Sequence, residues 1–181
     1  KAFAGESQAR NRYTFYAQVA RKEGLIQIAQ VFQLTAANEE VHAKEFFKAM
    51  NEGNLNQRTV DIGADFPVAL NDTLTNLESA AQGEHEEYAA LYPQFGQIAA
   101  EEGFPGIAKL FQNIASIEKN HEERFLAFYD LVKKNQLLKK DVEIAWVCSV
   151  CGYVHTGMEP PQICPVCKHE KGYYQVDIKA Y

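Results

Sequence analysis

The chain has 181 residues, with 24 acidic side chains against 18 lysines and arginines, which gives a formal net charge of −6 at pH 7. This acidic balance argues against a nucleic-acid partner, because such a partner requires a basic face. A hydrophobic fraction of 46% supplies enough apolar side chains for a core and excludes wholesale disorder. No apolar run approaches the roughly 18–20 residues that a membrane helix needs, so no membrane partner is expected.

Four helical segments are expected in the first three quarters of the chain. Residues 3–21 lack proline and are rich in helix formers, and residues 25–50 have apolar side chains at helical spacing. A third helix is expected from Asp72, a candidate N-cap, to about residue 102, with Pro93 inside it. The fourth is expected over about residues 107–134.

The connections between these helices predict their topology. Short turns join the first helix to the second and the third to the fourth, and such turns make antiparallel hairpins. Residues 52–71 form one long connection between the hairpins. A helix of about 26 residues is about 39 Å long, and some twenty connecting residues at about 3.3 Å each can span it. The fold class is therefore mainly α, a four-helix bundle with one long crossover, which also permits exchange of hairpins between subunits.

The two hairpins are copies of one repeat. Residues 31–47 (VFQLTAANEEVHAKEFF) align with residues 110–126 (LFQNIASIEKNHEERFL) at an offset of 79, whereas Glu6 aligns with Glu84 at an offset of 78. The second copy therefore holds one extra residue between Glu84 and Gly103. This insertion predicts a π-bulge or a kink in the third helix.

Each repeat has the same pattern of candidate metal ligands, a lone glutamate on its first helix and Glu-x-x-His on its second. The residues are Glu6, Glu39 and His42 in the first copy, and Glu84, Glu118 and His121 in the second. The i, i+3 spacing places each Glu-x-x-His pair on one helical face. Solvated glutamates on amphipathic helices would explain one such motif, but two matched copies are typical of carboxylate-bridged di-iron or di-manganese bundles. Four carboxylates offset most of the charge of two divalent ions, and each imidazole adds a nitrogen ligand.

Further polar side chains lie close to this pattern in the sequence. Glu87 follows the second lone glutamate by three residues on the same face, and its extra negative charge would stabilise a more oxidised centre. Its neighbours His85 and Glu86 point elsewhere and are expected at the surface. Tyr13 and Tyr92 follow the two lone glutamates by seven and eight residues, about two helical turns. Their hydroxyls could hydrogen-bond ligating carboxylates, or they could be core aromatics with a hydrated tip.

All four cysteines lie near the end of the chain, as two Cys-x-x-Cys pairs with twelve residues between them: Cys148, Cys151, Cys164 and Cys167. Four thiolates at this spacing predict a tetrahedral site for zinc or iron. Gly152, Pro165 and the surrounding aromatic residues favour a rubredoxin-like knuckle. No cysteine remains for a disulfide framework, which favours a reducing, cytoplasmic compartment. A zinc site would be structural, whereas a single iron would cycle by one electron, and this pattern leaves both open.

Residues 2–13 (AFAGESQARNRY), the two Glu-x-x-His helices, Glu84-x-x-Glu87 and the cysteine pairs together resemble the rubrerythrin family through essentially the whole chain. The resemblance implies a ferritin-like di-iron bundle at residues 1–135, a linker at 136–143 and a rubredoxin-like domain with a four-cysteine iron site at 144–181. It also implies a cytoplasmic peroxidase that reduces hydrogen peroxide to water in oxidative-stress defence. Lys168 stands where stand-alone rubredoxins have glycine.

The resemblance also assigns roles to the residues. The di-iron ligands would be Glu6, Glu39, Glu84, Glu87, Glu118 and His121. His42 would exchange with Glu87 when one iron moves between redox states. Tyr13 and Tyr92 fall at the family's tyrosine positions beside the ligands.

Electrons would reach the di-iron centre through the iron of the four-cysteine site. Because no Gly-x-Gly-x-x-Gly pattern follows a strand, NAD(P)H would act through a separate reductase or a rubredoxin. The short polar segment 133–142 makes it difficult for the cysteine module to reach its own bundle centre, so a neighbouring subunit of a homodimer or larger homo-oligomer would receive the electrons. Two alternatives remain at this point: a ferroxidase or iron-handling protein, and an interaction protein stabilised by zinc.

Overall fold

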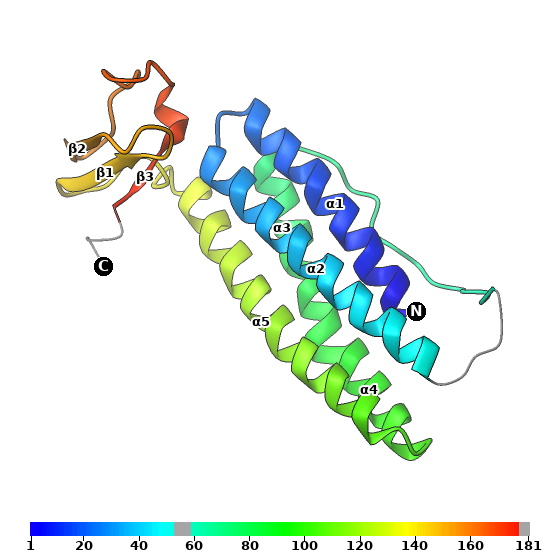
Figure 1. Cartoon of the computed structure of the whole chain (residues 1–181). Coiled ribbons are helices and arrows are strands. Elements are labelled where there is room, and N and C mark those ends of the chain that lie inside the picture. Colours follow the sequence, from blue (N-terminus) through cyan, green and yellow to red (C-terminus); the bar gives the residue numbers. More distant parts are fainter. Residues whose placement is uncertain (53–58, 178–181) are drawn as a thin grey trace.

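The computed structural model describes residues 1–52 and 59–177, and Figure 1 shows a long helical bundle with a small sheet domain at one end. The first hairpin consists of α1 (Ala2–Lys22) and α2 (Ile26–Glu52). The second consists of α3 (Thr73–Glu86), the π-helix η1 (Glu87–Leu91) and α4 (Tyr92–Glu101), which run on from one another, followed by α5 (Pro105–Lys133). The predicted mainly helical bundle of two hairpins is therefore confirmed.

Local sequence signals set where these helices begin and end. Gly24 and Gly103 close the two hairpin turns with φ values of 74° and 85°, a left-handed conformation that glycine adopts without steric cost. Asp72 caps α3 as predicted, because its carboxylate accepts a hydrogen bond from the Thr75 amide at 2.8 Å. The Thr73 amide also donates to the Glu23 carboxylate at 3.2 Å, which ties the start of the second hairpin to the end of α1.

The extra residue of the second repeat is accommodated as a π-helical turn. The Tyr92 amide donates to the Glu87 carbonyl, an i to i+5 hydrogen bond. Of the two predicted forms, a π-bulge or a kink, the structure has the π-bulge. Pro93 lies at the start of α4, directly after this turn.

Residues 59–71 of the crossover form neither helix nor strand and run along the outside of the bundle (Figure 1). The Gln8 side chain donates to the Pro67 carbonyl at 2.8 Å. The Tyr16 hydroxyl donates to the Ala69 carbonyl at 2.8 Å. These bonds hold the second half of the crossover against α1, whereas its first half, predicted from residue 52 onward, lies largely outside the described residues.

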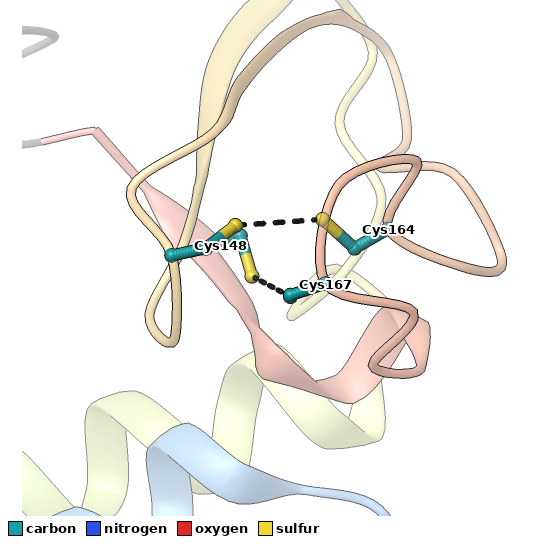
Figure 2. A group of neighbouring side chains, drawn as sticks. Cys148, Cys164 and Cys167 are labelled. Carbon is teal, nitrogen blue, oxygen red and sulfur yellow. Dashed lines mark hydrogen bonds between the residues drawn. The ribbon is translucent and has the colours of Figure 1, made fainter.

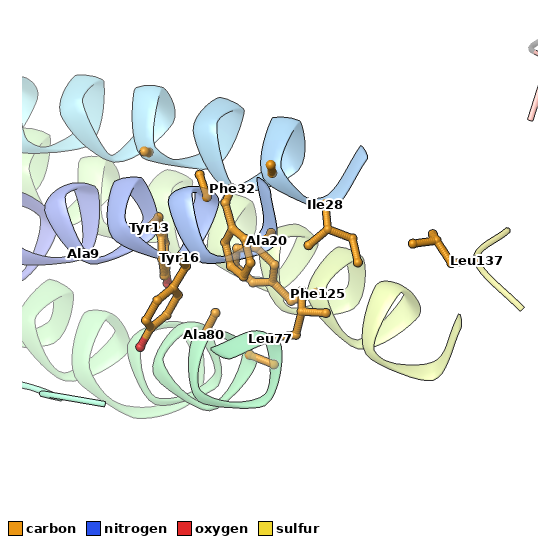
Figure 3. Packing of buried hydrophobic residues seen from close by; sticks show 14 residues of the cluster. Ala9, Tyr13, Tyr16, Ala20, Ile28, Phe32, Leu77, Ala80, Phe125 and Leu137 are labelled. Atoms are coloured by element: carbon orange, nitrogen blue, oxygen red, sulfur yellow. The ribbon is translucent and has the colours of Figure 1, made fainter. Parts of the chain in front are cut away.

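Two apolar clusters pack along the bundle, and the predicted metal ligands lie between them. The larger cluster lies at the end near the sheet domain and contains Tyr13, Tyr16, Phe32 and Phe125 (Figure 3). The smaller one is built on Phe46, Tyr92 and Ile114. Because Tyr13 and Tyr92 each hydrogen-bond a glutamate of the ligand pattern, one from each cluster, the polar centre separates the two cores.

The C-terminal domain is a three-stranded antiparallel sheet of order β2-β1-β3, with β1 (Ile144–Cys148) between β2 (Val154–Gly157) and β3 (Tyr174–Val176). A short 3-10 helix, η2 (Lys171–Tyr173), precedes β3. Trp146 is fully buried in its small core and donates to the Gly157 carbonyl at 2.8 Å. The expected small sheet with cysteine knuckles is confirmed.

The sheet domain is docked on the end of its own bundle. Leu137, in the segment between the domains, is buried in the larger bundle cluster, and Leu138 contacts the cores of both domains. Gly172 lies against the α1–α2 turn so closely that a Cβ there would be 1.8 Å from the Gly24 carbonyl oxygen. Only glycine fits at this contact without displacing the backbone.

Candidate metal centres

Four helices of the bundle each present one glutamate of the predicted pattern to the interior. Glu6 comes from α1, Glu39 from α2, Glu84 from α3 and Glu118 from α5, and each is at most 1% exposed. His42 and His121 lie one turn after Glu39 and Glu118 and are also buried. The repeat therefore places two copies of the same ligand set on facing helices.

These six side chains form two overlapping groups of donor atoms, each within 4.8 Å of one another. One group is Glu6, Glu39, His42 and Glu118, and the other is Glu39, Glu84, Glu118 and His121. Glu39 and Glu118 belong to both groups. A carboxylate that offers one oxygen to each of two neighbouring positions is suited to bridge two metal ions.

Each of the two shared carboxylates has one oxygen close to His42 and the other close to His121. His42 Nδ1 lies 2.9 Å from Glu39 Oε2 and 2.9 Å from Glu118 Oε1. His121 Nδ1 lies 3.1 Å from Glu39 Oε1 and 2.8 Å from Glu118 Oε2. Each position thus has two shared oxygens, one imidazole and one further carboxylate, from Glu6 or Glu84.

The donor set fits two divalent iron ions. Glu6 Oε2 and Glu84 Oε2 are buried oxygens without a hydrogen-bond partner, and Glu39 Oε1 and both oxygens of Glu118 have only a histidine nitrogen beside them. Burying ionised groups without partners costs several kcal/mol each, and cations coordinated by these oxygens would remove that cost. Carboxylate oxygens with one imidazole nitrogen per metal are a ligand set of di-iron bundles.

Without cations, this cluster holds protons instead. Burial, reinforced by the Glu39 charge, raises the pKa of Glu84 to about 8. Burial disfavours a charged His42, but its hydrogen bonds to Glu118 and Glu39 outweigh this and raise its pKa to about 9. Metal binding therefore has to displace protons from these groups.

Both candidate tyrosines donate to glutamates of the cluster. The Tyr13 hydroxyl donates to Glu84 Oε1 at 2.5 Å, and the Tyr92 hydroxyl donates to Glu6 Oε1. Burial raises the pKa of both hydroxyls well above the usual value, so both remain protonated donors. Of the two interpretations of these tyrosines, this geometry favours hydrogen bonding to ligating carboxylates.

Glu87 differs from the other predicted ligands because its carboxylate belongs to neither donor group. It is half-buried, at the first residue of the π-helix, and lines a cavity of about 820 Å³ beside the cluster. His42, its predicted exchange partner, lies in the first group. His85 and Glu86 are exposed, as expected, and His85 Nδ1 lies 2.9 Å from a Glu122 carboxylate oxygen.

Sequence reasoning missed two arginines close to the cluster. Arg12 is only 7% exposed, and Arg124 is half-buried and donates to Thr35 Oγ1 at 2.7 Å. A signal for Arg12 was present, because it falls on the helical face that also holds Glu6, Ala9 and Tyr13. A charged residue inside a buried stripe needs a partner or a function.

The four cysteines converge at the two knuckles of the sheet domain (Figure 2). Cys148 Sγ lies 3.6 Å from Cys167 Sγ, and Cys151 Sγ lies 3.7 Å from Cys164 Sγ. The four thiols are therefore close together but form no disulfide. Burial raises the pKa of Cys164, but backbone amides of its knuckle outweigh this and lower it to about 6. Such amides stabilise the thiolate, the form that binds metal.

The residue after each cysteine pair has a left-handed backbone. Gly152 has φ 76°, and Lys168 has φ 63° at the matching place in the second knuckle. Lysine in this conformation is strained, whereas glycine is not. The lysine side chain compensates in part by donating to the Pro165 carbonyl at 2.9 Å.

The fold and donor sets define a ferritin-like protein with a carboxylate-bridged dinuclear site and an attached four-cysteine module. Residues 1–129 match the profile of the family described as Rubrerythrin, and residues 146–175 match that of its rubredoxin-like domain. Rubrerythrin-1 of Clostridium acetobutylicum is 49% identical, with 100% of this chain and 93% of that protein aligned. Rubrerythrin of Clostridium perfringens is 45% identical, again with 100% of this chain and 93% of that protein aligned. The chain belongs to the rubrerythrin family.

A solved structure of nigerythrin in its fully reduced, all-ferrous state is also similar. Its TM-score is 0.64 at 33% identity, and the match covers 97% of this chain and 83% of that chain. The cofactors of the family are thus a di-iron centre in the bundle and an iron in the four-cysteine site, and this chain has the donor set for both. Among the described residues, no helix is both long and apolar enough to cross a membrane.

Proposed function

We propose that this protein is a non-haem di-iron peroxidase, for which H2O2 + 2 electrons + 2 protons gives 2 H2O. The observation that supports this most directly is the union, in one chain, of a dinuclear carboxylate site and a four-cysteine iron module. A protein that only stores or oxidises iron has no need of an attached one-electron carrier.

In this proposal Glu39 and Glu118 would each offer one oxygen to both metal positions, and each position would be completed by one carboxylate and one histidine. The remaining ligands are Glu6 with His42 and Glu84 with His121, and Glu87 is an alternative ligand to His42. When bound, the two irons supply the two electrons that break the O–O bond.

The chain's own groups supply hydrogen bonds and protons at the ends of the site. Tyr92 holds its hydroxyl proton at Glu6 Oε1, and Tyr13 holds its proton at Glu84 Oε1. Both hydroxyls are buried, so these protons are held at the two carboxylate oxygens and away from bulk water. We propose that they keep the two terminal carboxylates oriented and pass protons toward departing water.

We further propose that electrons arrive from the cysteine module of a neighbouring subunit in a cytoplasmic homodimer or larger oligomer. The module docks at Gly24, at the end of the bundle where Glu23 binds Thr73; from that end Glu84 lies 11 residues and Glu6 18 residues along the chain, which corresponds to about 17 Å and about 27 Å of helix. Electron transfer slows steeply with distance, so a route within one chain is unfavourable. A separate NAD(P)H-dependent reductase or a rubredoxin would reduce the iron of the four-cysteine site.

The proposal is tested by reducing the iron-loaded protein anaerobically and following its reoxidation by stopped-flow absorbance. We expect hydrogen peroxide to reoxidise it at least about tenfold faster than dioxygen at equal concentration. A tenfold difference in rate corresponds to about 1.4 kcal/mol of activation free energy. Cys148→Ser should keep a single rapid reaction with peroxide but lose turnover with an external donor. Faster reaction with dioxygen would instead indicate a ferroxidase. Zinc in both sites of the native protein would indicate an interaction protein.

A further inference from the structure

The Arg12 guanidinium is an unexplained charge in the bundle interior. It is 7% exposed, and its Nε and Nη1 atoms have no hydrogen-bond partner. On one side it lies over the ring of Tyr13, with Cζ 5.3 Å from the ring centroid. Burying a guanidinium with unused donors is costly, so a partner that accepts hydrogen bonds is expected at this place.

Arg12 lines the same cavity of about 820 Å³ as Glu87. This cavity lies between α1, the helix formed by α3, η1 and α4, and residues 63–67 of the crossover. Its wall includes Tyr92, whose hydroxyl binds Glu6, so the cavity extends to the edge of the carboxylate cluster. A small molecule in this cavity would meet Arg12 and Glu87 on its way to the ligands.

A glycine lies beside each of these charged groups. A Cβ on Gly83 would lie 3.3 Å from Arg12 Nη2, and a Cβ on Gly5 would lie 3.7 Å from Glu87 Oε1. Both side chains line this cavity, and no ion pair joins them in the part of the chain that the structure describes.

Arg12 and Glu87 together are complementary to a hydroperoxide. A guanidinium only donates hydrogen bonds, and a carboxyl group offers an accepting oxygen in either protonation state. Hydrogen peroxide both donates and accepts, so it can bind between the two groups. Dioxygen has no proton to donate and is a weak acceptor, so it gains little from either group.

We propose that Arg12 and Glu87 form an outer binding site that holds hydrogen peroxide at the edge of the carboxylate cluster, and that Arg12 makes the protein selective for peroxide over dioxygen. This inference rests on the proposed peroxidase function and adds a specificity-determining residue to it. The step is binding alone: Arg12 donates to a peroxide oxygen and Glu87 accepts from the peroxide hydroxyl.

The first experiment compares Arg12→Leu, Arg12→Lys and the matched control Arg10→Leu. Arg10 lies on the same helix but is exposed; it pairs with the exposed Glu40 at 3.7 Å and donates to Asn11 Oδ1 at 3.2 Å. For each iron-loaded, reduced protein, reoxidation rates are measured separately with hydrogen peroxide and with dioxygen over a range of concentrations.

We expect Arg12→Leu to lower the second-order rate constant for peroxide about tenfold or more, as for loss of a hydrogen bond from a charged group. The effect should appear as a higher half-saturating peroxide concentration, with the saturated rate nearly unchanged. The dioxygen rate should stay within about twofold of wild type. Arg12→Lys should recover part of the loss, because it keeps a charged donor, and Arg10→Leu should match wild type.

A second readout does not depend on activity. Crystals of the zinc-loaded protein, which cannot turn over peroxide, are soaked briefly in hydrogen peroxide. Two-atom density between Arg12 and Glu87 is expected in wild type and Arg10→Leu and should be missing in Arg12→Leu. Iron content is measured on all variants, and Arg12→Gln replaces Arg12→Leu if the latter fails to load iron.

The outcomes separate the two proposals. If wild type reacts no faster with peroxide than with dioxygen, the peroxidase function fails. If wild type is selective but the Arg12 variants keep full peroxide rates, or lose both rates in parallel, the role of Arg12 is refuted. Absence of peroxide density in soaked wild-type crystals would equally overturn the outer site.

Discussion

Tyr13 and Tyr92 link the two hairpins at single atoms. Tyr13 on α1 binds Glu84 on α3, and Tyr92 on α4 binds Glu6 on α1. Each repeat therefore supplies a buried donor to the lone glutamate of the other repeat. Because a misplaced hairpin would leave both carboxylates and both hydroxyls without partners, these bonds help to set the register of one hairpin against the other.

Replacing Tyr13 with phenylalanine should weaken iron binding by about ten- to hundredfold, because outer hydrogen bonds orient ligating carboxylates. Affinity is measured by competition with a chelator. Tyr16→Phe is the matched control, since this buried hydroxyl donates to the Ala69 carbonyl and contacts no glutamate of the cluster. Equal affinity losses in both variants would mean that Tyr13 acts only through general packing.

At the scale of the element, the π-helix is the one place where the two repeats differ in length. Glu84 and Glu118 are both buried, although they lie on opposite sides of the inserted residue in the repeat alignment. The wide turn absorbs that residue, so both flanking helical segments keep their inward faces. It also begins at Glu87, the carboxylate that has no counterpart in the first repeat.

Deleting Ala89, an exposed residue inside η1, should convert the π-turn to a regular α-helix and leave the flanking residues in register. We expect a helical content and a melting temperature close to wild type, but at least about tenfold slower reaction with peroxide, because the backbone that carries Glu87 is rebuilt. Circular dichroism and stopped-flow absorbance measure the two effects.

The control deletes Gln97, an exposed residue in the regular helix α4, between the buried Gly96 and Ala99. This deletion rotates everything beyond it by about 100° relative to the preceding turn. It should therefore lower the melting temperature markedly. Similar destabilisation by both deletions would show that the π-turn absorbs no insertion.

At the scale of the whole molecule, the cluster explains how an acidic chain tolerates buried carboxylates. Four of its 24 acidic residues are the fully buried glutamates of the cluster. Without metal, their burial is compatible with folding because Glu84 takes up a proton readily and the two histidines remain charged. The stability of the metal-free bundle must therefore depend on pH.

Metal-free protein should lose stability as pH rises from 5 to 9. Glu84 has a folded pKa of about 8, raised by burial, so its stabilising protonation is lost as pH rises from its unfolded value near 4.5 through 8. His42, raised to about 9 against the effect of burial, adds a loss above its unfolded value near 6.5. Glu39 has the opposite effect on stability, but only at pH values below this range. Its hydrogen bonds to the histidines outweigh the effect of burial and lower its pKa to about 2, so its contribution is lost only as the pH falls.

We expect the melting temperature of the metal-free protein to fall by about 5 °C or more between pH 5 and pH 9. The iron- or zinc-loaded protein should change much less in calorimetry, since metal has already displaced the protons. Metal-free Glu84→Gln should show a shallower fall than wild type. A metal-free protein that gains stability toward pH 9 would contradict the charge assignment of the cluster.

Much of this protein could be predicted from spacing within single segments. Glu39 with His42, Glu118 with His121 and the two Cys-x-x-Cys pairs are local patterns, and the repeat showed that the first two occur together. The insertion near Glu87 was also visible, because repeat offsets can be compared without knowing distances. The family, the bundle, the sheet domain and both iron sites are confirmed, whereas the domain boundaries, the individual ligand roles and the exchange of His42 with Glu87 remain predictions.

The sequence by itself thus determined which side chains share a helical face, because helix periodicity relates residues three or four apart. Only the tertiary structure decided what depends on distances between segments. Glu39 and Glu118 are shared by both donor groups, Arg12 faces the same cavity as Glu87, and Gly172 seats the cysteine module against Gly24. These relations arise when helices and crossover pack together, and periodicity within one segment contains no information about them.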